Sequence, residues 1–114
     1  MQHAIGTTRS CISANSEAVR RFVKSAAEGL DFLRKNRADA VPIMSKYTKI
    51  TDPAQINEAL DAYDKAWAKI PAPSQPAIEA VLASSETPTA KTAKWDQFVD
   101  DRFIQELISS DMFR

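Results

Sequence analysis

The sequence contains very few of the residues that build metal sites, disulfides and phosphate-binding loops. It has one cysteine, Cys11, one histidine, His3, and two glycines, Gly6 and Gly29, in 114 residues. A single cysteine cannot form a disulfide within the chain, and one histidine with one cysteine does not give the clustered ligands of a metal site. No glycine-rich loop is present to bind phosphate. A cysteine nucleophile needs a base beside it, so we expect Cys11 to be a small, half-buried side chain. We predict no catalytic residue, no metal, no cofactor and no enzyme activity.

The charges balance, and long hydrophobic runs are missing. The sequence has fifteen basic and fifteen acidic side chains. This balance argues against a nucleic-acid partner, because proteins that bind nucleic acids carry an excess of basic residues. No apolar run approaches the ~20 residues of a membrane span. The first residues, "MQHAIGTTRSCIS", lack the basic region and apolar core of a secretory signal. We therefore expect a cytoplasmic protein if this chain is the whole product.

Apolar residues recur at helical spacing along most of the chain and predict a mainly α fold of about five helices. Each helix is expected to start at a residue that suits the first turn of a helix, such as Asn, Ser or the pair Asp-Pro. The expected helix starts are Asn15, Asn36, Asp52, Ser74, and Lys94 or Trp95. The clearest apolar stripe belongs to the third helix and consists of Ile56, Ala59, Leu60, Tyr63, Ala66 and Trp67. Residues 15–110 are thus expected to be one helical region.

Two residues are unusual inside these expected helices. Gly29 costs about 1 kcal/mol relative to alanine in a helix interior, so we expect it to allow close approach of another backbone. Pro42 lies about six positions into the second helix, where it removes a backbone hydrogen bond. We expect either a kink at Pro42 or a helix that starts late.

The N-terminal residues 1–12 are expected to be a short strand or a loop. The stretch "HAIGTTRSCI" has β-branched residues and a glycine, which suits a strand. A strand without a partner is not stable, so it would belong to a sheet whose other strands lie outside this chain. The 114 residues would then be a single partial domain.

The same segment contains the most ligand-like residues of the chain, Thr7, Thr8 and Arg9. "GTTR" offers a flexible glycine, two hydroxyl groups and a guanidinium group. Hydroxyls and guanidinium groups hold oxyanions through hydrogen bonds. We therefore take Thr7, Thr8 and Arg9 as the candidate ligand-binding residues.

Three stretches of the chain match a known pattern in order and with natural spacing. "TTRSCISANSEAVRRFVKSAAEG" is similar to a strand, "TTR", a short helical stretch and "NPE-VRRFVKA--EG". "NRADAVPIMSKYTKITDP" is similar to "NPEEAV-IMAKYTKI-DP", and "AKTAKWDQFVDDRFIQEL" is similar to "K--DFVD-RF--EL". Together they resemble the last third of a periplasmic substrate-binding protein of an ABC importer. The resemblance is to the branch that includes nitrate, sulfonate, taurine and thiamine-precursor binding proteins.

This resemblance implies a type II binding-protein fold, in which two α/β lobes surround a cleft. The chain would be part of one lobe, truncated or split from the rest, with residues 1–12 as the crossover strand. The intact protein would bind a small anionic or organic solute in the periplasm and deliver it to a membrane permease. Thr7, Thr8 and Arg9 would contact that solute.

The alternative is a stand-alone helical module that binds another protein or forms a homodimer and has no ligand. Helix faces that once covered a sheet would stay apolar after truncation. The chain would then cover them by association with a second copy or with another protein.

Overall fold

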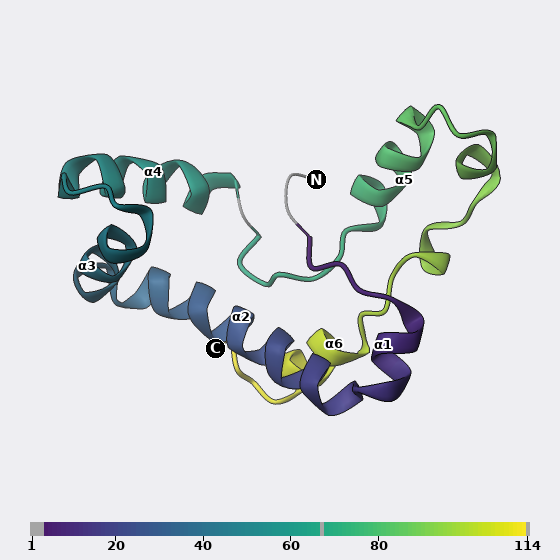
Figure 1. Ribbon diagram of the computed structural model, residues 1–114, viewed down its shortest axis with the longest axis horizontal. Helices are drawn as coiled ribbons and strands as arrows, with labels where there is room; N and C mark the ends of the chain where they lie inside the picture. The colour runs from purple at the N-terminus through teal and green to yellow at the C-terminus, as the bar shows by residue number, and fades with distance from the viewer. Residues whose placement is uncertain (1–3, 67, 114) are drawn as a thin grey trace.

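The computed structural model describes residues 4–66 and 68–113 and has a mainly α fold (Figure 1). Over these residues the chain forms six α-helices and two short 3₁₀ helices, and it contains no strand. The α-helices are α1 (Arg9–Ala14), α2 (Ser16–Lys35), α3 (Arg37–Thr48), α4 (Pro53–Ala66), α5 (Gln75–Ser84) and α6 (Arg102–Ser109). The 3₁₀ helices are Pro88–Thr92 and Trp95–Gln97. The prediction of a mainly α fold is confirmed.

The helices are arranged as an open V (Figure 1). α2 lies along the base with α1 and α6, while α3 and α4 form one arm and α5 with the 3₁₀ helices forms the other. The radius of gyration is 16.6 Å, whereas a compact chain of this length has about 13 Å. The accessible surface is 8417 Å², about 2,200 Å² more than the roughly 6,200 Å² of a compact chain of this mass. Much of the surface that folding usually covers is therefore exposed.

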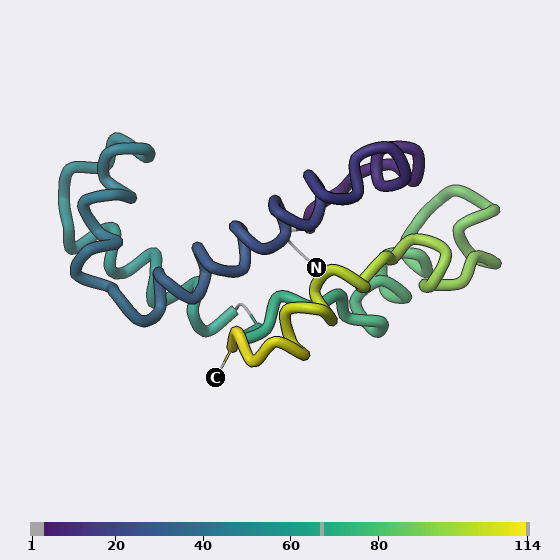
Figure 2. The backbone as a smooth tube through the Cα atoms, turned by 90° about the horizontal axis from the view of Figure 1, so that it is seen from below, coloured from purple at the N-terminus to yellow at the C-terminus, as the bar shows by residue number. Residues whose placement is uncertain are grey.

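The base of the V holds the main apolar cluster, between α2 and α6. Ala27 of α2 is buried against Ile104 and Leu107 of α6. Ile70 and Ala72, in the segment that follows α4, also pack on this cluster, and Figure 2 shows that segment passing close to α6. The apolar spacing within α2 and α6 therefore brings together parts of the chain that are far apart in sequence.

The α3–α4 arm has its own small set of buried side chains, Ala40 of α3 and Ile56 and Leu60 of α4. α3 ends at Thr48 because Lys49 adopts a left-handed conformation, with φ of 63°. α4 then begins at Pro53, where the Asp52 carboxylate accepts a hydrogen bond from the Ala54 N–H at 2.9 Å. The start predicted at Asp52 agrees with this geometry, because a side-chain cap and a proline in the first turn both favour a helix start. α3 begins at Arg37, one residue after the predicted Asn36, whose side chain makes no capping hydrogen bond.

The short N-terminal strand is not found in the described part of the segment. Residues 4–8 are irregular, and Arg9 begins α1, which runs to Ala14. The Thr8 hydroxyl accepts a hydrogen bond from the Cys11 N–H at 3.1 Å and so caps this helix. No described strand lies beside residues 4–8 to pair with them. Of the two alternatives for this segment, residues 4–8 agree with the loop, while residues 1–3 lie outside the described residues. For residues 9–12 both alternatives are wrong, because the Thr8 side chain caps a helix there and these residues form the first turn of α1.

The last helix starts later than predicted. Trp95–Gln97 is a 3₁₀ helix, and α6 begins only at Arg102. Asp100 and Asp101 separate the two, because aspartate is unfavourable in a helix interior and favourable just before a helix start.

Gly29 differs from expectation, and one of the two alternatives for Pro42 is excluded. Apart from the backbone of its own helix, no atom of the described residues lies within 4 Å of a Cβ atom built on Gly29, so no other described segment approaches it closely. α3 runs from Arg37 through Pro42 to Thr48, so the helix does not start late. Trp67, predicted at the end of the α4 stripe, lies outside the described residues.

Candidate functional site

The three candidate ligand-binding residues lie together on the surface at the start of α1. Thr7, Thr8 and Arg9 are all exposed. The Thr8 hydroxyl caps α1 and lies 3.0 Å from the Ser10 hydroxyl. Arg9 donates from Nη2 to the Gln97 carbonyl oxygen at 2.6 Å, which joins α1 to the second 3₁₀ helix. Thr8 and Arg9 therefore have structural roles in this chain, whatever else they bind.

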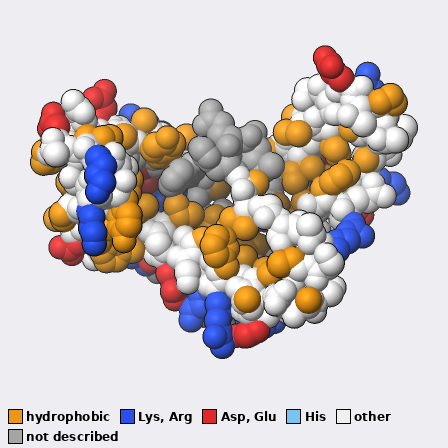
Figure 3. All heavy atoms as spheres, viewed as in Figure 1, with side chains coloured by type: hydrophobic (Ala, Val, Ile, Leu, Met, Phe, Trp, Pro, Cys, Tyr) orange, Lys and Arg blue, Asp and Glu red, His pale blue; other side chains and the backbone are white. Residues whose placement is uncertain are grey.

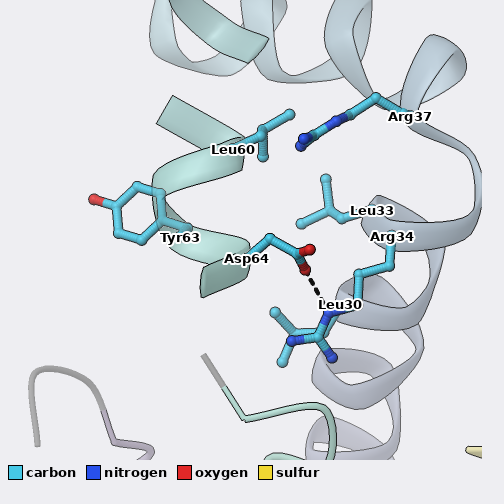
Figure 4. A pocket seen from close by; sticks show the side chains of 7 residues that line it. All are labelled: Leu30, Leu33, Arg34, Arg37, Leu60, Tyr63 and Asp64. Atoms are coloured by element: carbon cyan, nitrogen blue, oxygen red, sulfur yellow. Dashed lines mark hydrogen bonds and ion pairs between the residues drawn. The ribbon is translucent and has the colours of Figure 1, made fainter. Parts of the chain in front are cut away.

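A pocket lies between the C-terminal end of α2 and α4 (Figure 4). It is lined by Leu30, Leu33, Arg34, Arg37, Leu60, Tyr63 and Asp64. Its volume is about 80 Å³, while binding sites for organic ligands have roughly 300–1,000 Å³. The pocket has room for a few water molecules of about 30 Å³ each, and it is too small for an organic solute.

Arg34 is the most connected side chain at this pocket. Its Nε donates to the Asp64 carboxylate at 3.0 Å. Its Nη1 donates to the Lys69 carbonyl at 2.7 Å, and its Nη2 donates to the Ala68 carbonyl at 3.0 Å. These carbonyls follow the end of α4, where backbone oxygens lack partners within a helix. Arg34 therefore fastens the end of α4 to α2.

A second hollow lies beside the second 3₁₀ helix and is lined by Glu79, Ala93, Lys94, Trp95 and Asp96. Its volume is about 330 Å³, and three of its five lining residues, Glu79, Lys94 and Asp96, are charged. Most ligand pockets are mainly apolar and bury most of the ligand surface. Trp95 is only half-buried, so this hollow has the shape of a shallow surface depression.

The basic residues at the start of α2 form ion pairs with nearby glutamates. Arg20 bonds Glu17 and Glu106, each at 2.7 Å, and Arg21 bonds Glu17 at 3.0 Å. Lys24 lies 3.7 Å from Glu28. Because each cation has an acidic partner, this string of basic residues is a solvated helix face and offers little positive potential to an anion.

The ion pairs change the titration of the two glutamates that contact Arg20. Hydrogen bonds from the Arg20 guanidinium group lower the pKa of Glu106. Hydrogen bonds from Arg20 and then Arg21 lower the pKa of Glu17. The pKa of Arg20 is raised in turn, first by its hydrogen bond to Glu106. Both glutamates therefore stay ionised to lower pH in the folded chain than in the unfolded one.

We predict that the chain loses stability in mild acid and that Glu106→Gln weakens this loss. The folded pKa of Glu106 lies below its ordinary value of 4.5, so its contribution is complete above that pH and disappears as the pH falls through the folded pKa. Urea midpoints measured from neutral pH to about pH 3 test this. Glu86→Gln, on the loop after α5, is the control and should keep the wild-type profile. Identical profiles for Glu106→Gln and wild type would contradict the prediction.

The described residues contain no group of three His, Cys, Asp or Glu side chains placed to bind a metal ion. None of the helices in the described ranges is long and apolar enough to cross a membrane. Cys11 is half-buried on α1, as expected for a small packing residue.

Comparisons of the chain with protein-family models, with curated proteins and with solved structures find no match. The resemblance to importer binding proteins consequently rests on the sequence strings given above.

Proposed function

We propose that this chain is the helical C-terminal part of a solute-binding protein of an ABC importer, truncated or split from its other segments. The intact protein would bind a small anionic or organic solute in the periplasm and deliver it to a membrane permease. The proposal gives the chain a supporting role, in which its helices cover one lobe of the binding protein.

The observation that carries the proposal is the large exposed surface of the V. About 2,200 Å² beyond that of a compact chain of this mass is uncovered, and it includes large apolar side chains such as Tyr47 and Phe98. Hydrophobic side chains lie on the surface of both arms (Figure 3). A helical layer that covers a sheet within a larger protein would have such a surface once the sheet is removed.

The position of the resembling strings gives further support. The string "NRADAVPIMSKYTKITDP" starts at Asn36, which precedes α3, and ends at Pro53, the first residue of α4. The string therefore covers a complete unit, α3 with both of its connections. Similarity over a whole unit is more informative than similarity over an arbitrary piece of helix.

Within this proposal, Thr7, Thr8 and Arg9 contact the solute. Arg9 has five N–H donors, and one bond to Gln97 holds the guanidinium group in place. A guanidinium group fixed in this way can donate to a carboxylate, sulfonate or nitrate oxygen.

The test joins this chain to the lobes encoded directly upstream of it and measures solute binding by calorimetry. Arg9→Ala should weaken the binding of an anionic solute about 10–100-fold, because a hydrogen bond to a charged group contributes roughly 1.5–3 kcal/mol. Lys91→Ala, on the 3₁₀ helix Pro88–Thr92, removes a positive charge elsewhere and should leave binding unchanged. The proposal fails if no lobe is encoded upstream or if the joined protein binds none of the anions tested. Equal affinities of wild type and Arg9→Ala would remove Arg9 from the site.

A stand-alone interaction module is the second candidate function. The exposed aromatic side chains favour it, since Phe22, Tyr47 and Phe98 are 60%, 76% and 62% exposed. Light scattering of the purified chain at rising concentration tests it, and a monomer at high concentration would argue against it.

A further inference from the structure

α2 carries two apolar seams, of which only one is packed within the chain. The packed seam contains Val23 and Ala27, which contact the α6 cluster. The other seam, which we call the α2 strip, consists of Ala18, Phe22, Ser25, Gly29 and Phe32, all exposed. Their spacing alternates between four and three residues, which is the spacing of residues that meet a second helix along a coiled-coil seam.

The α2 strip is both apolar and accessible. Phe22 is 60% exposed and Phe32 is 39% exposed. Between them lie Ser25 and Gly29. Apart from the backbone of α2 itself, no atom of the described part of the chain lies within 4 Å of a Cβ atom built on Gly29. Glycine costs about 1 kcal/mol relative to alanine inside a helix, and close approach of another helix is a physical reason to accept that cost.

The sizes of the residues in the strip suit an antiparallel copy of the same helix. With a twofold axis at Ser25, Ala18 of one chain lies opposite Phe32 of the other, because both are seven positions from the axis. Phe22 lies opposite residue 28, beside Gly29 of the other chain. Each phenylalanine thus meets a small residue, as good packing across an interface requires. A parallel pair would instead place phenylalanine on phenylalanine and glycine on glycine.

The charges beside the strip suit the same arrangement. Arg21 and Glu28 lie on one flank of the strip, with side chains that are 78% and 55% exposed. In an antiparallel pair of helices the same flank of each helix faces its copy, so Arg21 of one chain lies within one residue of Glu28 of the other. The twofold axis then gives two ion pairs between Arg21 and Glu28, one on each side of the axis. These pairs favour this register over others.

We propose that two copies of this chain form a homodimer in which α2 packs antiparallel on α2 through the α2 strip. A stable interface covers about 800 Å² on each partner, which is less than half of the roughly 2,200 Å² that this chain exposes in excess. The proposal does not depend on solute binding, and its test uses neither solute nor permease. Failure of the proposed transport function would therefore leave it standing.

The first test is the mass of the purified chain in solution, measured by sedimentation. We expect a species of twice 12.6 kDa at high concentration and dissociation on dilution. Phe22→Glu should weaken the dimer at least tenfold, roughly the effect of losing one well-packed aromatic contact. Phe98→Glu changes a phenylalanine of similar exposure, 62%, outside the strip, and should leave the dimer unchanged. Ser25→Glu is the second strip variant, to be used if Phe22→Glu loses its helical circular dichroism.

The second test reports the orientation of the two helices. In a Cys11→Ser background, Ser25→Cys places one thiol of each chain beside the twofold axis, and oxidation should link the chains. Ala18→Cys places the two thiols about 14 residues apart along the helices, roughly 21 Å at 1.5 Å per residue, and should not link them. Arg21→Glu should weaken the dimer, and adding Glu28→Arg should restore it.

Several outcomes overturn the proposal. A monomer at all concentrations would show that another part of a longer protein, or solvent, covers the strip. A dimer that tolerates both Phe22→Glu and Ser25→Glu would place the interface elsewhere. Cross-linking through Ala18→Cys as efficient as through Ser25→Cys would show a parallel pair.

Discussion

Replacing Phe103 with alanine is expected to lower the free energy of unfolding by about 3–5 kcal/mol, the usual cost of deleting a buried phenylalanine side chain. Phe103 is only 3% exposed and belongs to α6, which packs on α2. The guanidinium groups of Arg20 and Arg102 lie 5.6 and 5.1 Å from the centre of its ring. Alanine would remove this ring and leave both guanidinium groups without the aromatic face they cover. Urea unfolding followed by circular dichroism measures the change.

The loss of one buried side chain matters because few side chains of this chain are buried. Seven hydrophobic residues of the described chain are buried, and two of them are alanines. Small domains are stable by only about 5–15 kcal/mol, so the loss of Phe103 would remove a large part of that stability. Phe98→Ala is the matched control, since Phe98 is 62% exposed, and its cost should stay within about 0.5 kcal/mol. Similar costs for the two variants would show that α6 does not pack on α2 as described.

Arg34→Ala is expected to lower the free energy of unfolding by about 2–3 kcal/mol, since hydrogen bonds to charged groups each contribute roughly 1.5–3 kcal/mol and do not add fully. The Arg34 side chain is only 22% exposed. It donates to the Asp64 carboxylate and to the carbonyls of Ala68 and Lys69. Without it, the two carbonyls lose their donor and α4 loses its connection to α2. Arg34→Lys should recover only part of the loss, because an ammonium group lacks the fork of donors that reaches several oxygens.

A double-mutant cycle with Asp64→Asn separates the carboxylate from the carbonyls. Asp64 is 57% exposed, and exposed ion pairs contribute little, typically about 0–1 kcal/mol. Arg34→Ala should therefore cost nearly as much in the Asp64→Asn background as in the wild type. If the cost disappears in that background, the ion pair and not the carbonyl contacts fastens α4. Lys24→Ala, which removes an exposed cation paired with Glu28, measures how much stability the loss of a surface ion pair costs.

Local signals predicted most of the helices. The starts of α2, α3, α4 and α5 were placed within one residue, at Asn15, Asn36, Asp52-Pro53 and Ser74. Residues that favour a helix start act over one turn, so their effect is visible in sequence. Of these four positions, only Asp52 makes a side-chain capping hydrogen bond, from the Ala54 N–H. α6 begins later than the predicted start at Lys94 or Trp95, because Asp100 and Asp101 favour the position just before a helix over its interior.

The N-terminal segment shows where local signals were insufficient. β-branched residues at 5–8 suggested a strand, but a strand forms only beside another strand. The Thr8 side chain instead caps α1, a role that threonine also favours. The choice between these structures depends on what lies beside the segment in space, and a single sequence does not state it.

The candidate site was also only partly predictable from the sequence. Thr7, Thr8 and Arg9 were chosen from their chemistry, and the structure adds that Arg9 is held by Gln97. In the sequence, Arg34 is one of several charged residues of α2 and nothing singles it out. Its partners lie 30 to 35 positions further along the chain, and no local pattern links them. The contact follows from the packing of α4 on the end of α2.

The division of the buried side chains between the base and one arm of the V has a consequence for cooperativity. Ala27, Ile104 and Leu107 form one cluster at the base, and Ala40, Ile56 and Leu60 belong to the α3–α4 arm. α2 packs on both α6 and α3. Disruption of one set of buried side chains therefore affects the other set through α2. Amide hydrogen exchange in such a chain reports regions that open with different free energies. The slowest exchange is expected in the middle of α2, because this helix packs on elements of both sets.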